Sequence, residues 1–131
     1  MTGKGKYLYD TDVIIDYLKG ESEARNLLEE ETGMQCMSVV TIAELYAGAR
    51  DMKECEVIKG LAEYFEVIDI NQEIAREGGL YKQKYYKSHN VALPDGLIGA
   101  TAICLGLELK TLNIKHYPMI KYLKAAYRKE S

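Results

Sequence analysis

The sequence predicts an α/β domain with three layers, α/β/α, in which helices cover both faces of a central, mainly parallel sheet. Two observations lead to this prediction. Short apolar runs suited to buried strands alternate along the chain with longer segments in which apolar residues recur every three or four positions. At 131 residues, 47% of them hydrophobic, the chain is also long enough for one domain over residues 1–131 with a substantial core.

The first half of the chain is expected to contain three helices and two strands. In order, these are a strand at 7–9, helices at 13–18 and 21–31, a strand at 34–40 and a helix at 41–50. The aromatic and aliphatic run Tyr7-Leu8-Tyr9 suits a buried strand, and Gly20 and Gly33 each follow a segment of helical periodicity, where glycine commonly ends a helix.

The second half is expected to contain three more helices and two more strands. In order, these are a helix at 51–65, a strand at 66–70, helices at 71–88 and 95–105, and a strand at 107–112. Asn71 is a suitable N-cap. The helix at 95–105 is the most apolar, and its small residues permit close backbone approach, so we expect it under the sheet. Beyond Pro118 the tail fits either a basic helix or a strand followed by a tail.

The cysteines and the apolar segments indicate the cellular compartment in which the protein is expected. Cys36, Cys55 and Cys104 form no C-x-x-C pair, so neither a disulfide framework nor a zinc ribbon is indicated. The first residues are not an apolar signal segment, and the apolar stretch 91–109 is interrupted by Pro94, so no membrane span is indicated. We therefore expect a cytoplasmic protein in a reducing environment.

Charge is distributed unevenly along the chain. Residues 1–79 hold 17 acids and 8 bases, a net charge of −9, whereas residues 80–131 hold 3 acids and 9 bases, a net charge of +6. A basic half of this kind is suited to binding a polyanion while the whole chain stays soluble. The simpler interpretation is that the helix surfaces are charged only because they are solvated.

Three carboxylates are expected at one edge of the sheet. Asp10, Glu44 and Asp95 each fall just after a strand or in the first turn of a helix, and a parallel sheet gathers such positions at one edge. Separate structural roles remain open for two of them. Glu44 stands three residues after Thr41, as in a capping box, and Asp95 follows Pro94 at a helix start. Asp12 fits the N-cap of the first helix, which leaves Asp10 without a capping role.

Carboxylates clustered in this way need a positive partner. Two of them about 4 Å apart repel by roughly 4 kcal/mol at an effective dielectric constant of about 20. No lysine or arginine stands within four residues after Asp10 or before Glu44. A divalent cation is therefore expected, and an all-oxygen ligand set suits Mg²⁺ or Mn²⁺.

Four stretches of the sequence resemble the PIN domain family, and within it the VapC-type toxins of prokaryotic toxin–antitoxin pairs. They are residues 8–16, 38–45, 95–102 and 109–117, which occur in the order typical of the family. The resemblance implies a metal-dependent endoribonuclease with Asp10, Glu44 and Asp95 as its acidic site. Many relatives carry a further Asp where Asn113 or His116 stands here, and Asp12 stands where a neutral polar residue is more usual.

The resemblance also suggests a role for each site residue. Asp10 and Asp95 would hold the metal directly, and Glu44 would bind the metal or a metal-bound water and act as general base. Asp12 and Asn113 are candidates for a fourth position. Two hydroxyl residues, Thr11 and Thr111, fit either positioning of substrate and water or a purely structural role.

Substrate binding is predicted for basic and aromatic residues of the second half. The candidates are Lys82, Lys84, Lys87, Lys110, Lys115, Tyr85 and Tyr86. Lysines would contact phosphates and the tyrosines would stack on unpaired bases. The alternative is a solvated helix face on which the lysine stems lie over the aromatic rings.

The expected partners are RNA, a cognate antitoxin that covers the acidic cleft, and a second copy of the chain in a homodimer. The helix at 51–65 is a candidate docking surface, unless its apolar stripe faces only the core. Two other functions fit parts of the sequence. One is a catalytically weak module that binds RNA or protein, and the other is a haloacid-dehalogenase-like phosphatase, since Asp10-Thr11-Asp12-Val13 fits its nucleophile motif.

Overall fold

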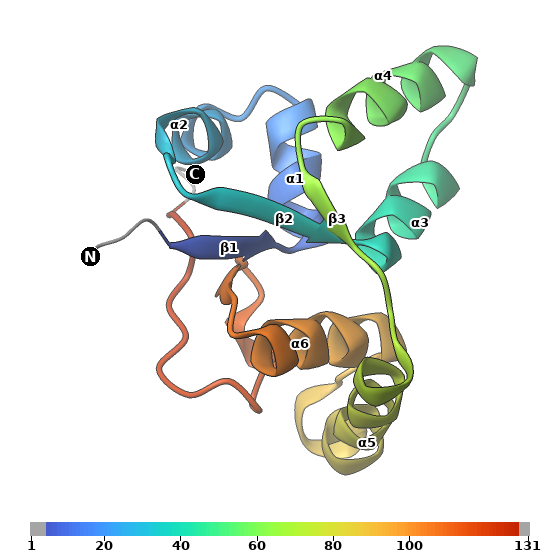
Figure 1. Ribbon diagram of the computed structural model, residues 1–131, viewed down its shortest axis with the longest axis vertical. Coiled ribbons are helices and arrows are strands. Elements are labelled where there is room, and N and C mark those ends of the chain that lie inside the picture. The colour runs from blue at the N-terminus through green and yellow to red at the C-terminus, as the bar shows by residue number, and fades with distance from the viewer. Residues whose placement is uncertain (1–4, 129–131) are drawn as a thin grey trace.

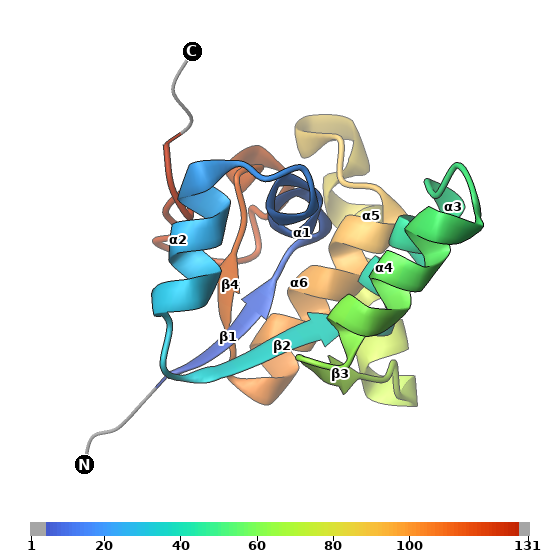
Figure 2. The same ribbon diagram turned by 90° about the horizontal axis from the view of Figure 1, so that it is seen from above.

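A computed structural model describes residues 5–128 and contains a four-stranded, fully parallel sheet. Its strands are β1 (Lys6–Tyr9), β2 (Met34–Ser38), β3 (Glu66–Ile68) and β4 (Glu108–Lys110). Their order across the sheet is β3-β2-β1-β4, which places β1 between β2 and β4 (Figure 2). In register, Leu8 pairs with Cys36 on one side and with Leu109 on the other.

Helices cover both faces of this sheet (Figure 1). They are α1 (Thr11–Leu18), α2 (Ser22–Glu30), α3 (Val39–Ala47), α4 (Met52–Ala62), α5 (Gln72–His89) and α6 (Leu93–Leu105). Successive strand residues point to opposite faces. Tyr9 and Met37 accordingly join a core with α1, α2, α3 and α4, whereas Leu8 and Cys36 join a second core with α6. The predicted three-layer fold is confirmed.

Several predicted boundaries differ from the structure. Helix α3 begins at Val39 with Ser38 as its N-cap, so the expected start at Thr41 is wrong. The last three strands are shorter than predicted. Beyond the short 3-10 helix Ile114–His116, the described tail through residue 128 forms neither a helix nor a strand, and the Ala126 N–H donates to the Thr111 carbonyl oxygen at 2.9 Å.

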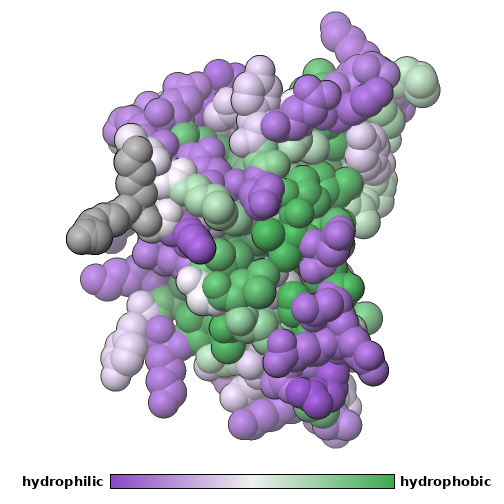
Figure 3. All heavy atoms as spheres, viewed as in Figure 1, coloured by the Kyte–Doolittle hydropathy of each residue, from purple (hydrophilic) through white to green (hydrophobic). Residues whose placement is uncertain are grey.

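The stripe predicted over residues 51–65 faces mainly the core. Ile58 is buried there, as is Phe65 just after the helix, whereas Met52 is 77% exposed at the helix start. Apolar side chains gather across the middle of the face seen in Figure 3, and polar side chains cover its upper and lower ends. No helix within residues 5–128 combines the length and the apolar character that crossing a bilayer requires.

Helices α5 and α6 approach each other closely through two glycines. A Cβ placed on Gly96 would overlap the Gly78 carbonyl oxygen, and one placed on Gly78 would lie 2.9 Å from the Leu97 Cα. Both residues are buried. Since Gly96 directly follows Asp95, this contact also fixes the position of a predicted site residue.

Gly96→Ala should therefore destabilise the protein. The added methyl group forces the two helices apart, and overpacking of this kind costs typically 1–3 kcal/mol. Gly79→Ala is the matched control, because a Cβ there meets nothing within 4 Å and alanine favours a helix by about 0.5–1 kcal/mol. Thermal unfolding measures both. A melting temperature that is equal in Gly96→Ala and Gly79→Ala would contradict the close contact.

Candidate active site

The candidate active site lies at the carboxyl edge of the sheet, where β1 and β4 end. Asp10 directly follows β1 and Thr111 directly follows β4. The Asp10 N–H donates to the Lys110 carbonyl oxygen at 2.9 Å, which continues the strand pairing up to this edge. Asp95 lies in the first turn of α6, and its charge and that of Asp10 both act on the Tyr117 hydroxyl. The edge therefore gathers groups from both ends of the chain.

Asp10 is held by three hydrogen bonds and is only 5% exposed. Its Oδ1 accepts from the Thr11 N–H at 2.8 Å, and its Oδ2 accepts from the hydroxyls of Thr111 at 2.7 Å and Tyr117 at 2.8 Å. Asp10 is the N-cap of α1, so the assignment of that role to Asp12 is wrong. Burial and the charges of Asp10 and Asp95 raise the pKa of Tyr117 far above its ordinary value, which keeps its hydroxyl a donor.

Thr11 links Glu44 to Asp10 through hydrogen bonds. The Thr11 hydroxyl donates to Glu44 Oε1 at 2.6 Å and lies 3.0 Å from the Thr41 hydroxyl, while the Thr11 N–H binds Asp10. The capping-box interpretation of Glu44 is wrong, because Ser38 caps α3 and the Glu44 side chain is turned toward α1. Thr11 therefore has a direct structural contact with each of two predicted site carboxylates.

Asp95 lies near the other two carboxylates. Burial raises its pKa, and the charges of Asp10 and Glu44 raise it further, although the Ala92 N–H and His116 act in the opposite direction. Its Oδ2 accepts from the Ala92 N–H at 3.3 Å and lies 3.5 Å from His116 Nδ1. Two of the acids predicted to converge, Asp10 and Glu44, thus both act electrostatically on the third, Asp95.

Asp12 and Asn113, the two candidates for a fourth position, differ in environment. Asp12 Oδ1 accepts from the Val13 N–H at 2.8 Å, and its Oδ2 accepts from the Leu112 N–H at 2.9 Å, which ties α1 to the end of β4. Burial and the charge of Asp10 nevertheless raise the pKa of Asp12 to about 6. Asn113 is exposed, and its hydrogen bond to the Thr111 hydroxyl oxygen uses its backbone N–H and not its side chain. Fourth-position roles for both stay predictions.

The oxygen atoms of the three carboxylates are suitable ligands for a hard divalent cation. Among the described residues, Glu44 Oε2 and Asp95 Oδ1 accept no hydrogen bond, and Asp10 Oδ1 accepts only one. Each predicted ligand therefore retains a carboxylate lone pair, and such oxygens are the ligands that Mg²⁺ and Mn²⁺ prefer. In their present orientations, no three His, Cys, Asp or Glu side chains within residues 5–128 are grouped so as to hold a metal ion. The ligand set accordingly stays a prediction.

Most of the predicted substrate-binding residues lie on α5, and two lysines lie on other elements. On α5, Lys82 and Lys87 lie 4.9 and 5.8 Å from the centre of the Tyr86 ring, and Lys84 lies 5.2 Å from that of Tyr85. The other two lysines lie elsewhere. Lys110 pairs with Glu108 at 2.8 Å on β4, and Lys115 is exposed on the 3-10 helix that also carries His116. The α5 lysines thus lie over aromatic rings, as the simpler interpretation expected, while remaining exposed.

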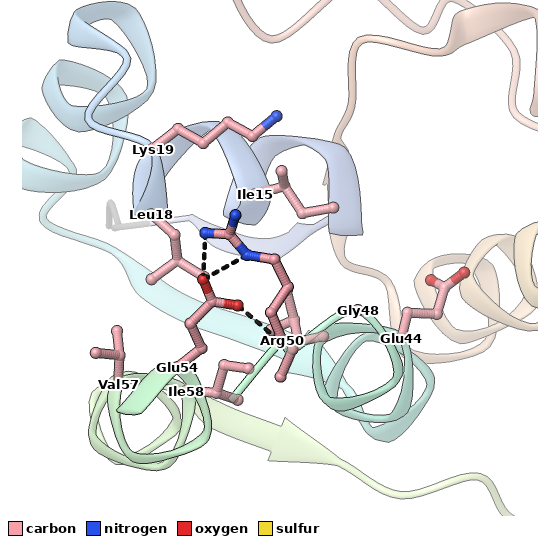
Figure 4. A pocket seen from close by; sticks show the side chains of 11 residues that line it. Ile15, Leu18, Lys19, Glu44, Gly48, Arg50, Glu54, Val57 and Ile58 are labelled. Carbon is pink, nitrogen blue, oxygen red and sulfur yellow. Dashed lines mark hydrogen bonds and ion pairs between the residues drawn. The ribbon is translucent and has the colours of Figure 1, made fainter. Parts of the chain in front are cut away.

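A groove of about 570 Å³ lies between α1, α3 and α4 and reaches Glu44 (Figure 4). Its walls include Leu18 and Val57, and an ion pair of Arg50 with Glu54, 2.6 Å long, lies in its middle. Glu44 lines this groove and also accepts from Thr11, so it belongs both to the groove and to the candidate active site.

Sequence reasoning overlooked Tyr117 and gave His116 no site role. Both come from the last predicted stretch, and the structure brings them to Asp10 and Asp95, respectively. A signal was present, since His116-Tyr117 follows the strand that pairs with β1. What the sequence could not indicate is that a 3-10 helix turns these side chains back toward the sheet edge.

Comparison with known proteins finds relatives that match over most of the chain. Over 123 residues, 92% of each chain, the sequence is 41% identical to Ribonuclease VapC10 of Mycobacterium tuberculosis. It is 33% identical over 119 residues to Ribonuclease VapC1 of Methanocaldococcus jannaschii, which covers 90% of this chain and 83% of that protein. A toxin–antitoxin complex from Klebsiella pneumoniae contains a similar chain, with a TM-score of 0.79, 30% identity and coverage of 92% and 98%.

The fold of a more distant structure agrees. A chain of DNA-bound VapBC from Salmonella typhimurium gives a TM-score of 0.74 at 22% identity, with coverage of 92% of this chain and 96% of that chain. The sequence also matches the PIN domain family over residues 7–117, which include every acid of the candidate site. The resemblance noted in the sequence is confirmed, and the chain belongs to the PIN domain family.

Proposed function

We propose that the protein is a metal-dependent endoribonuclease of the VapC type, which hydrolyses RNA phosphodiester bonds at the edge formed by Asp10, Glu44 and Asp95. The observation that carries this proposal is the hydrogen-bonded link from Asp10 through Thr11 to Glu44 at the sheet edge, where the charges of both acids also raise the pKa of Asp95. The similarity to proteins named Ribonuclease VapC supports it. The phosphatase alternative is less favoured, because the sequence matches the PIN domain family over residues 7–117.

The chain's own residues supply the frame of the reaction. A bound Mg²⁺ or Mn²⁺ would lower the pKa of a water molecule and offset charge on the phosphoryl oxygens. Asp10 and Asp95 would hold it through the oxygens that retain lone pairs. Glu44, exposed and oriented by the Thr11 hydroxyl, would accept a proton from the attacking water as general base.

RNA would bind along α5 on its way to the acidic edge. Gly96 packs closely against α5 near Lys82, since a Cβ on Gly96 would lie 3.5 Å from the Lys82 backbone nitrogen. Lys82 is therefore on a turn of α5 that packs against the residue directly after Asp95. Phosphates would replace the aromatic rings as partners of the α5 lysines, and this would free the Tyr86 face, 45% exposed, for base stacking.

The test is cleavage of structured RNA by the purified protein in Mn²⁺ and in EDTA. We expect cleavage in Mn²⁺ and none in EDTA, with recovery when Mn²⁺ is restored. Calorimetric titration with Mn²⁺ identifies the alternative of a binding-only module, which would bind RNA without taking up the ion. Cleavage that persists in EDTA would overturn the metal-dependent mechanism.

A small antitoxin is the proposed protein partner, with the groove between α1, α3 and α4 as its docking surface. The similar chain from Klebsiella pneumoniae belongs to a toxin–antitoxin complex, which supports this assignment. An apolar helix lying over Leu18 and Val57 would reach Glu44 at the groove end. The proposal also includes a homodimer and a cytoplasmic location. Light scattering of the purified chain tests whether it is a dimer.

A further inference from the structure

Two hydroxyl groups donate to the same oxygen of Asp10. Thr111 Oγ1 lies 2.7 Å and Tyr117 Oη lies 2.8 Å from Oδ2, whereas Oδ1 accepts only the Thr11 N–H. Hydrogen bonds to a charged carboxylate are stronger and shorter than neutral ones, so this pair fixes the rotation of the carboxylate about its last bond. The remaining lone pair of Asp10 is then on Oδ1.

Tyr117 is itself rigidly placed. It is 1% exposed, and its ring belongs to the core that contains Leu8, Ile98 and Leu109. Gly99 of α6 lies close to the ring, because a Cβ there would lie 3.4 Å from Tyr117 Cδ1. The buried ring is therefore held by this core, and its hydroxyl reaches Asp10 from the face of the sheet opposite to the core that α1 joins.

We propose that Tyr117 is a positioning residue for Asp10, whose hydroxyl, together with that of Thr111, holds Oδ2 so that Oδ1 is presented to the divalent cation. This inference rests on the proposed function, since it assumes that Asp10 binds the ion. Tyr117 touches neither metal nor substrate and acts only through the carboxylate. Partners that orient a ligand in this way typically contribute 10- to 100-fold to metal affinity.

Tyr117→Phe tests the proposal with a matched control in the same chain. Tyr127→Phe removes the same atom from the same kind of bond, because the Tyr127 hydroxyl donates to Asp16 Oδ2 at 2.6 Å. Both variants lose one hydroxyl–carboxylate bond and keep their rings. Mn²⁺ affinity is measured by calorimetry on EDTA-treated protein, and the rise in melting temperature on adding Mn²⁺ gives a second measurement.

We expect Mn²⁺ affinity to fall about tenfold or more in Tyr117→Phe and to stay within about twofold of wild type in Tyr127→Phe. The Mn²⁺-induced rise in melting temperature should shrink only in Tyr117→Phe. Equal affinities in the two variants would overturn the positioning role while leaving the nuclease proposal intact, provided that the wild type binds Mn²⁺ and cleaves RNA. A wild type that takes up no Mn²⁺ would overturn both.

Discussion

Asp95→Asn should reduce RNA cleavage in Mn²⁺ by roughly 10²- to 10³-fold, the range typical for loss of a major electrostatic group in an active site. The same substitution should raise the melting temperature of the metal-free protein. The neutral amide removes the cost of burying a charge near Asp10 and Glu44, both of which raise the Asp95 pKa. Its carbonyl oxygen can still accept from the Ala92 N–H, so the helix start is preserved.

Opposite changes in activity and stability distinguish a functional charge from a structural one. Cleavage rates are measured at saturating Mn²⁺, and melting temperatures are measured in EDTA. Glu56→Gln, an exposed substitution on α4, is the control and should change neither quantity appreciably. A lower melting temperature in Asp95→Asn would mean that the carboxylate serves mainly to start α6, and the site would then have to be reassigned.

Asp12→Asn should stabilise the metal-free protein above pH 7 by about 2 kcal/mol. Raising the pKa of Asp12 from 3.8 to about 6 corresponds to about 3 kcal/mol of disfavoured ionisation. The amide cannot accept from both the Val13 and Leu112 N–H groups as the carboxylate does, and that loss costs about 1 kcal/mol. At roughly 4 °C per kcal/mol for a chain of this length, the melting temperature should rise by about 8 °C.

The effect of Asp12→Asn should depend on pH. Folded Asp12 holds its proton more tightly than unfolded Asp12, so the neutral carboxyl's contribution to stability is complete below pH 3.8 and is lost as pH rises through about 6. Asp12→Asn should therefore be slightly less stable than the wild type near pH 4, where only the lost hydrogen bond counts, and about 2 kcal/mol more stable by about pH 7. Urea unfolding in EDTA across this range measures it, and a pH-independent difference would contradict a raised pKa.

Much of the fold could be predicted because its signals are local. Short apolar runs for the strands, with segments of helical spacing between them, indicated the correct layers, and Asn71 caps α5 as expected. Boundaries were harder to predict because Ser, Thr and Asp all make acceptable caps, so neighbouring candidates such as Asp10 and Asp12 differ little in local energy. The tertiary contact with Leu112 decides which of the two faces β4.

The placement of Asp10 and Glu44 could be predicted from topology, whereas the groups that hold them could not. Both follow from the rule that parallel strands end at one edge, since Asp10 comes directly after β1 and Glu44 lies in α3, the helix that directly follows β2. Tyr117 is 107 positions from Asp10, and an isolated sequence gives no means of pairing a buried tyrosine with one particular carboxylate across that separation. Thr11 presents the same difficulty, because its bond to Glu44 depends on how α1 packs against α3.

The central position of β1 constrains when this protein can become active during its own synthesis. The first strand emerges early from the ribosome, yet one of its two neighbours, β4, ends at Lys110, and the Tyr117 hydroxyl completes the surroundings of Asp10 later still. A nascent chain that ends before Tyr117 lacks the hydrogen bond from that hydroxyl to Asp10, even if its helices have already formed. Topology thus delays the finished site until translation has passed Tyr117.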